Sequence, residues 1–283
     1  MTDLKQWVES SAYSKALGVQ LQDLTDEGAA LHLPFIKENS NPGGALHGGV
    51  YASLSIIGAH ATARQVLGED VSPFHTTAFQ INYLSAAINE GVSARARLLR
   101  RGKELAFVEV TCTSEAGKDV SHATLMIRGR KGADATIGPA PSIDAPGSNP
   151  GDMGPAIAGM VPFISERGIQ IEHMDAGFAR LTMPFKDAHL DNISGGTHEG
   201  AALALLDTAG AMAGWAVTGS GPYKASTPSM QAQVIEIPPA EELVAHARVT
   251  HRDNEIFYSD VEVSGVKSQR VCARGTILYR IVT

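Results

Sequence analysis

An internal repeat limits most strongly what this chain of 283 residues can fold into. The segment Gly44-Ala45-Leu46-His47-Gly48-Gly49 aligns with Gly195-Gly196-Thr197-His198-Glu199-Gly200, so the two histidines are 151 residues apart (198 minus 47). The same spacing continues without a gap through further pairs: Asn41 and Asn192, Thr76 and Thr227, Gln80 and Gln231, Ala94 and Ala245, Arg97 and Arg248, Arg101 and Arg252, Phe107 and Tyr258, Val120 and Val271. A solenoid usually needs at least about three repeats. We therefore expect a duplicated domain that forms an internal pseudo-dimer.

The two copies are separated by a segment of linker composition. Residues 129–155 are crowded with Gly, Pro, Ala and Ser, which favour loops over packed elements. We expect one domain at residues 1–133, a linker at 134–154 and a second domain at 155–283. The chain length suits two domains of roughly 100 to 150 residues each.

Each copy shows the same order of hydrophobic patterns. A short amphipathic helix, two strands, a long apolar helix and then four strands rich in β-branched and aromatic residues follow one another. The long apolar helix is expected at 47–67 and 198–218, and its uniform apolarity predicts a buried position. The expected ranges of the other elements are 4–17, 19–23, 29–34, 76–84, 91–100, 104–114 and 119–128 in copy 1, and 155–167, 169–172 and 179–183 in copy 2. This order predicts an α+β fold, in which an antiparallel sheet wraps around a central apolar helix in each copy.

Composition and charge exclude several classes of function. The formal net charge of −7 argues against a nucleic-acid partner, which usually requires a basic domain. The first ten residues do not resemble a secretory signal, and we expect no membrane-spanning segment, so the chain is expected to be cytoplasmic. The two cysteines, Cys112 and Cys272, fit buried strand positions. No spacing of His and carboxylates predicts a metal site, and no phosphate-binding loop is recognisable, so no metal or cofactor is expected.

The order of elements, with His-Gly-Gly at the start of the central helix, resembles the hotdog-fold acyl-CoA thioesterases of the phenylacetate-pathway type. The resemblance covers almost the whole chain, twice. In that family an Asn precedes the His by six residues, and an acidic residue follows it by nine. Copy 1 has Asn41 and His47 but Ile56 at the acidic position. Copy 2 keeps Asp207 but has Glu199 where the family has a glycine.

The resemblance implies that each site lies between the copies, with the Asn and His-Gly from one copy and the acid and a hydroxyl residue from the other. One composite site would then contain Asn41, His47, Gly48, Asp207 and Thr227. Every expected element of the family is present in this set.

The other composite site would join Asn192, His198 and Glu199 to Ile56 and Thr76. With Ile56 at the acidic position, we expect this site to lack an acid that acts on water and to be inactive.

The residue types suit the hydrolysis of a thioester. Asp207 would be ionised at neutral pH and could act on water or attack the carbonyl directly. The Gly48 N–H at a helix start would polarise the thioester oxygen, because the absence of a Cβ allows close approach. Asn41 could orient the water or the carbonyl, Thr227 could hold Asp207 or the water, and His47 would position the loop.

Other interpretations remain open at this stage. Asp207 could pair structurally with a nearby arginine, Thr227 could be a packing residue of its strand, and His60 is better explained as a core residue than as a ligand. Two basic clusters at strand ends could meet the phosphates of coenzyme A. Their candidate arginines are Arg100, Arg101, Arg128 and Arg130.

Two other functions compete with hydrolysis of an acyl-CoA substrate. One is a non-catalytic acyl-CoA-binding or sensing protein, and the other is an enoyl-thioester hydratase. The resemblance also suggests a homodimer of the tandem chain. The sequence does not identify the acyl group.

Overall fold

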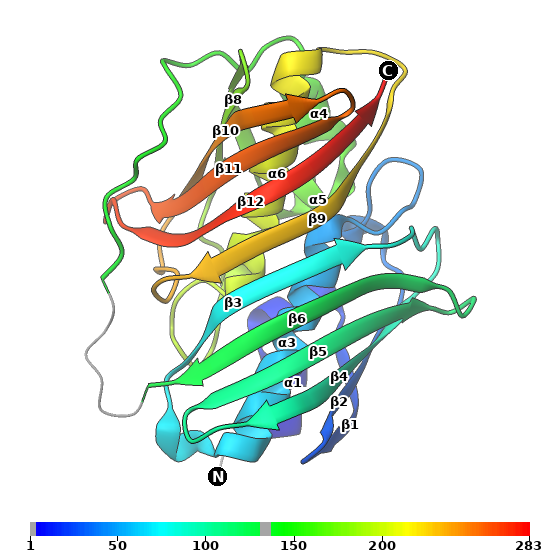
Figure 1. The fold of residues 1–283 in the computed structure, drawn as a ribbon, viewed down its shortest axis with the longest axis vertical. Coiled ribbons are helices and arrows are strands. Elements are labelled where there is room, and N and C mark those ends of the chain that lie inside the picture. Colours follow the sequence, from blue (N-terminus) through cyan, green and yellow to red (C-terminus); the bar gives the residue numbers. More distant parts are fainter. Residues whose placement is uncertain (1–3, 131–136) are drawn as a thin grey trace.

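The computed structural model describes residues 4–130 and 137–283, which form two similar halves joined through one sheet (Figure 1). In copy 1 the helices are α1 (Leu4–Ser10), α2 (Ala12–Leu17) and α3 (Gly48–Leu67). The strands of this copy are β1 (Gln20–Thr25), β2 (Gly28–Leu33), β3 (Phe74–Tyr83), β4 (Val92–Arg101), β5 (Leu105–Ser114) and β6 (Asp119–Gly129). Two short 3-10 helices, η1 (Lys37–Asn39) and η2 (Glu69–Val71), precede and follow α3.

Copy 2 repeats this arrangement. Its helices are α4 (Gly154–Met160), α5 (Pro162–Arg167) and α6 (Glu199–Thr218), with the 3-10 helix η3 (Asp187–His189) before α6. Its strands are β7 (Gln170–Asp175), β8 (Phe178–Met183), β9 (Lys224–Val234), β10 (Leu243–Asp253), β11 (Ile256–Gly265) and β12 (Val271–Val282). The long helices α3 and α6 therefore begin and end 151 residues apart, at the spacing of the sequence repeat.

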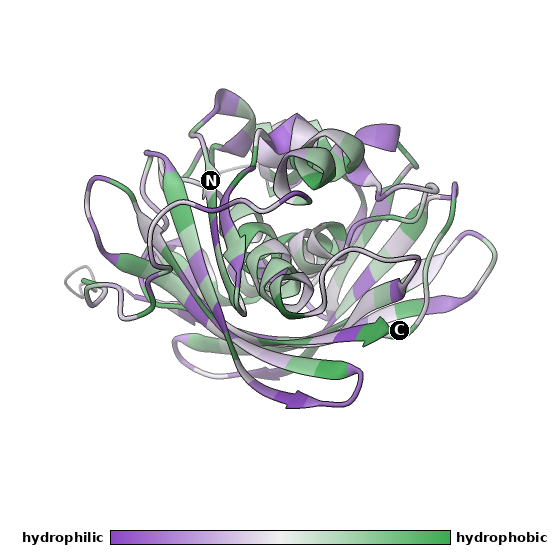
Figure 2. Ribbon diagram, turned by 90° about the horizontal axis from the view of Figure 1, so that it is seen from above, coloured by the Kyte–Doolittle hydropathy of each residue, from purple (hydrophilic) through white to green (hydrophobic). Residues whose placement is uncertain are grey.

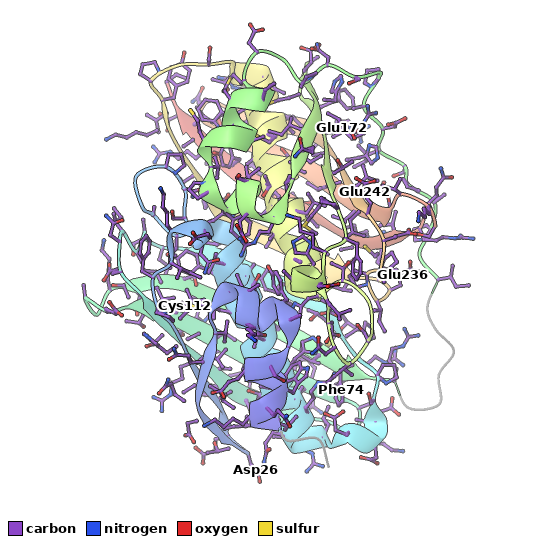
Figure 3. All side chains as sticks on the ribbon, turned by 180° about the vertical axis from the view of Figure 1, so that it is seen from behind. Asp26, Phe74, Cys112, Glu172, Glu236 and Glu242 are labelled. Carbon is purple, nitrogen blue, oxygen red and sulfur yellow. The ribbon has the colours of Figure 1, made fainter. Side chains whose placement is uncertain are left out.

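The two copies share a twelve-stranded antiparallel sheet with the order β1-β2-β4-β5-β6-β3-β9-β12-β11-β10-β8-β7. The sheet is continuous because β3 pairs with β9, and in that pair Gln80 lies opposite Gln231, its counterpart in the repeat. A pseudo-twofold axis therefore passes between these two residues. The sheet curves around the long helices, and the short helices lie on their other side (Figures 2 and 3). The α+β fold with one wrapped helix in each copy is thus confirmed.

The central helices α3 and α6 pack against each other through small residues. A Cβ on Gly49 would come within 2.5 Å of the Ala204 Cβ, and a Cβ on Gly200 would come within 2.9 Å of the Ser53 Oγ. These symmetric contacts bring the start of each helix beside the middle of the other. By length and hydropathy alone α6 could cross a membrane, but 83% of that stretch is buried inside the fold, as in a core helix.

The short helices differ from the single amphipathic helices expected in each copy. The first is interrupted at Ser11, whose backbone is extended, and the second is interrupted at Val161, which precedes Pro162. Steric hindrance from a proline ring disfavours helical geometry in the preceding residue. The expected boundary between domain 1 and the linker, at 133 and 134, lies outside the described residues. The described part of the linker ends where α4 begins, at Gly154.

Candidate active site

The start of α3 is shaped by His47, which caps the helix. The His47 Nδ1 accepts a hydrogen bond from the Gly49 N–H at 3.0 Å, and its ring stacks on Phe163 of copy 2 at a centroid distance of 4.0 Å. Burial, with the positive charge of Arg167, lowers the pKa of His47 to about 3. The imidazole is therefore neutral near pH 7 and acts here as a helix cap that fixes the loop.

Gly48 follows directly as the first residue of α3, and it lies against Asp207 of copy 2. A Cβ on Gly48 would stand 2.7 Å from the Asp207 Oδ2, so a larger residue would displace the carboxylate. The Gly48 N–H has no acceptor within the described residues. The first N–H groups of a helix lack partners in the helix and carry its positive dipole end. This N–H is therefore available to a developing negative charge.

Asp207 lies in the third turn of α6 and is only 3% exposed. Its Oδ1 accepts a hydrogen bond of 3.0 Å from the Thr227 Oγ1 on β9. Burial raises the pKa of Asp207 to about 6, and the bond from Thr227 opposes this rise. No lysine or arginine forms a salt bridge with Asp207 in the described chain, so the alternative of structural pairing with an arginine has no support.

Asn41 is the predicted residue with the weakest connection to this group. It is partly buried in the loop before α3, where its backbone N–H donates to the Ala45 carbonyl at 2.7 Å. Its side-chain amide forms no hydrogen bond with another described residue. The structure thus brings together Gly48, Asp207 and Thr227, with His47 behind them, and leaves the Asn41 amide without a protein partner.

Tyr83 belongs to this group although sequence reasoning missed it. Its hydroxyl donates to the Gly48 carbonyl at 3.3 Å, and its ring lies 3.5 Å from the Cβ position of Gly48. Burial, together with the negative charge of Asp207, raises its pKa. The one sequence feature that could have indicated Tyr83 is a difference between the copies, since the counterpart of Tyr83 in copy 2 is Val234. Tyr83 therefore distinguishes this composite site from the second one.

The second composite site has Ile56 at the acidic position, as expected, and it also has a carboxylate at the start of α6. Glu199 is the first residue of α6, and its Oε2 lies 2.6 Å from the Thr76 Oγ1 and 3.1 Å from the His60 Nε2. His60 stands one helical turn beyond Ile56, within reach of the longer glutamate side chain. His198 caps α6 through its Nδ1, which accepts from the Gly200 N–H at 3.0 Å. The acid has therefore moved to the helix start instead of disappearing.

The candidate arginines for coenzyme A phosphates lie at the ends of β4 and β6. Arg100 and Arg101 are exposed, and the Arg100 guanidinium lies 5.9 Å from the centre of the Phe107 ring. Arg128 contributes to a surface hollow of about 530 Å³ that also contains Lys103. The charges of Arg128, Arg130 and Glu199 all affect the pKa of His75. These two arginines therefore lie near the second composite site, which contains Glu199.

Two further features of the described residues bear on ligands. They contain no group of three or more His, Cys, Asp or Glu residues placed to hold a metal ion. A hollow of about 710 Å³ lies where β3 and β9 join, lined by residues that include Gln80 and Gln231. Neither Gly48 nor Asp207 contributes to it, so it is separate from the group described above.

Known proteins resemble the chain in family and in fold. Residues 36–128 match the model of the acyl-CoA thioesterase N-terminal domain family. No curated protein matches the chain. Among solved structures, a thioesterase candidate from Novosphingobium aromaticivorans DSM 12444 is similar with a TM-score of 0.71 at 16% identity, covering 93% of this chain and 98% of that one.

Two further solved structures are similar over nearly their whole lengths. A protein with a hotdog fold from Alicyclobacillus acidocaldarius has a TM-score of 0.66 at 18% identity, covering 96% of this chain and 98% of its own. An acyl-CoA thioesterase II, TesB2, from Mycobacterium marinum has a TM-score of 0.63 at 13% identity, with 96% and 97% covered. At these identities the likeness establishes the fold, while the phenylacetate-pathway type stays a prediction. The chain therefore has the hotdog fold twice over its length, and residues 36–128 of its first half match the N-terminal domain family of acyl-CoA thioesterases.

Proposed function

We propose that the chain hydrolyses an acyl-CoA thioester to the free acid and coenzyme A at the composite site of Gly48 and Asp207. The contact between these two residues supports this most directly. It places an unpaired helix N–H from one copy beside an ionisable carboxylate from the other. Hydrolysis requires both a donor for the carbonyl oxygen and a base for water.

The proposed reaction follows from these positions. The thioester oxygen accepts a hydrogen bond from the Gly48 N–H, and the α3 dipole stabilises the negative charge that develops on it. Asp207 takes a proton from water, whose oxygen attacks the carbonyl carbon. The C–S bond then breaks, and the sulfur leaves with a proton. A base with a pKa of about 6 is mostly ionised at pH 7 and stronger than an ordinary aspartate.

The neighbouring residues have supporting roles in this proposal. Thr227 holds one oxygen of Asp207 in place, so that Oδ2 remains directed toward Gly48. His47 fixes the helix start, and Asn41 provides a side-chain amide that can orient the water or the thioester. Direct attack by Asp207 on the carbonyl would use the same groups. Single turnover in ¹⁸O-labelled water distinguishes general-base hydrolysis, which puts one ¹⁸O into the acid product, from direct attack in which water opens the anhydride at the Asp207 carbonyl, which puts the label into Asp207 and none into the product.

Thiol release from a panel of short, branched, aromatic and long acyl-CoAs tests the function. We expect release by the wild-type chain and a loss of about 100-fold or more with Asp207→Asn, in line with the removal of a general base. Asp152→Asn, at an exposed linker position, is the matched control and should keep the wild-type rate. Tight binding of acyl-CoA without thiol release would instead identify a binding protein, and full activity of Asp207→Asn would refute the assigned acid.

A further inference from the structure

The second composite site contains a buried acid–base cluster contributed by both copies. The side chain of Glu199 is 11% exposed and that of His60 is 9% exposed. Besides meeting Glu199, the His60 Nε2 lies 3.0 Å from the Thr76 Oγ1. The three polar groups therefore form a closed triangle. This differs from a nucleophilic triad, in which the acid and the hydroxyl meet opposite nitrogens of the imidazole.

One oxygen of Glu199 is still available in this triangle. Oε2 meets both Thr76 and His60, whereas Oε1 receives only a long bond of 3.3 Å from the Thr76 N–H. The Glu199 N–H, which corresponds to that of Gly48, also has no acceptor within the described residues. A carboxylate oxygen with only one long hydrogen bond and a helix N–H without an acceptor among the described residues thus occur together here.

A small cavity adjoins this cluster. Its volume is about 20 Å³, and its lining includes Glu199, His60, Ile56 and Trp7. Such a volume holds one water molecule, and Glu199 and His60 provide polar partners for it. Ile56 fills the position of Asp207 with an apolar side chain, and the ionisable groups that line the cavity include Glu199 and His60 together with Asp191 and His198.

Basic residues lie near this site. His75 precedes Thr76 on β3, and the charges of Glu199, Arg130 and Arg128 all affect it. At the first site the corresponding position to Arg128 is Tyr279, and that of Arg64 is Trp215, which donates to the Tyr279 hydroxyl at 3.0 Å. The phosphates of coenzyme A carry negative charge, and arginine binds phosphate well. The basic surroundings therefore suit the same class of substrate.

We propose that the second composite site is a further thioester-hydrolysing centre, in which Glu199 and His60 replace the missing aspartate. The inference depends on the proposed function of the chain. Glu199 takes a proton from water, and the water oxygen bonds to the thioester carbonyl carbon. The carbonyl oxygen accepts from the Glu199 N–H, the C–S bond breaks, and the proton leaves with the sulfur. The products are one carboxylic acid and one coenzyme A thiol.

The second centre should be the slower one. Burial would raise the pKa of Glu199, but the charge of His60 and the hydrogen bonds from His60 and Thr76 outweigh it and keep the pKa below its usual value. A weaker base accepts a proton from water less readily. The first site should therefore dominate the wild-type rate and mask the second one.

Removing the dominant site makes the second one measurable. We expect Asp207→Asn to retain about 1% of the wild-type rate of thiol release, and Asp207→Asn/Glu199→Gln to lose at least about tenfold of that remainder. The matched control is Asp207→Asn/Glu242→Gln, which changes an exposed glutamate and should keep the remainder (Figure 3). Melting temperatures show whether each variant is folded.

The number of ligands bound per chain gives a second test of the second site, and this test does not require a double variant. Calorimetric titration of the wild-type chain with a non-hydrolysable acyl-CoA thioether should give two molecules per chain, and Gly48→Val, which obstructs the first site, should reduce this to one. A stoichiometry of one for the wild type overturns the inference. It is also overturned if Glu199→Gln lowers the melting temperature but leaves the remainder of Asp207→Asn unchanged, as for a purely structural bridge. If the wild type releases no thiol at all, the proposed function itself fails.

Discussion

The two composite sites have the same backbone arrangement, but their acidic residues occupy different positions in it. In both, the start of one central helix lies beside the third turn of the other, because the copies are related by the axis between β3 and β9. In the first site Gly48 lies against Asp207, and in the second Glu199 extends past Ile56 to His60. Both acids come from α6. The duplicated fold thus preserves the arrangement while only the side chains diverge.

The neighbours of each acid determine how strong a base it is. Asp207 has a hydroxyl partner and no cation, so burial dominates and raises its pKa to about 6. Glu199 is also buried, but His60 and Thr76 more than offset the burial and lower its pKa. The same fold therefore creates a carboxylate with a raised pKa on one side and a hydrogen-bonded carboxylate with a lowered pKa on the other.

A larger side chain at position 48, beside Asp207, should have the largest effect on the rate of the first composite site. Gly48→Val places a Cβ within 2.7 Å of the Asp207 Oδ2 and occupies the approach to the helix N–H. We expect the rate of thiol release to fall by about 100-fold, comparable to the loss of an oxyanion donor. Gly159→Val is the control, since no atom lies within 4 Å of a Cβ at that helical glycine. A wild-type rate for Gly48→Val would show that the two residues do not form the working site.

The burial of Asp207 predicts that Asp207→Asn, which lowers the rate, raises the free energy of unfolding. The folded-state pKa of about 6 exceeds the ordinary value of 3.8, so the protonated form favours the fold and this contribution is lost as pH rises through about 6. Asp207→Asn removes the ionisation, and its free energy of unfolding should exceed that of the wild type by about 2 to 3 kcal/mol at pH 8. Urea unfolding at pH 8 and at pH 4 measures this difference, which should nearly vanish at pH 4.

Glu199 is the internal control for that measurement. Its pKa is lowered in the fold, so its charged form stabilises the structure above the ordinary pKa of glutamate. Glu199→Gln should therefore lower the free energy of unfolding at pH 8. If both variants change stability in the same direction, the electrostatic contrast between the sites is wrong.

The sequence predicted the backbone of this comparison better than its side-chain contacts. The constant spacing of the repeat predicted two copies with one long buried helix in each, and the resemblance to the hotdog-fold thioesterases implied that Gly48 and Asp207 share a site. Glu199 was expected beside Thr76, but its contact with His60 was missed because it depends on how far a glutamate reaches across the helix pair. Tyr83 was missed for a similar reason, since its place beside Gly48 follows from the register of β3 in the sheet.

The interrupted short helices show a related limit of sequence reasoning. The apolar pattern of residues 4–17 is continuous, yet the chain bends at Ser11. There the Asn192 side chain accepts a hydrogen bond from the Ala12 N–H at 3.3 Å and donates to the Ser10 carbonyl at 3.4 Å. A partner from the other copy thus satisfies backbone groups at the bend. Local periodicity does not contain that information.

This use of Asn192 distinguishes it from Asn41, its counterpart in the repeat. Because the Asn41 amide has no hydrogen-bond partner among residues 4–130 and 137–283, Asn41→Ala should reduce thiol release by about tenfold, the order expected for one positioning hydrogen bond to a charge-bearing transition state. Asn192→Ala should leave the rate nearly unchanged and lower the free energy of unfolding by about 1 kcal/mol. Rates and urea unfolding of both variants test the pair. Equal losses of activity would mean that both loops serve the reaction in the same way.

The smallest expected effect concerns the hydroxyl that holds Asp207. The bond from Thr227 lowers the pKa of Asp207, so Thr227→Val should raise that pKa and move the acidic midpoint of the rate profile upward from about 6, by about one unit or less. Because the ionised carboxylate is the active form, the rate should fall most near pH 6 and little near pH 8. The counterpart Thr76→Val should leave the midpoint in place, since Thr76 meets Glu199. If the midpoint moves downward in Thr227→Val, or moves equally in both variants, the ionisation of Asp207 does not set the pH dependence of the rate.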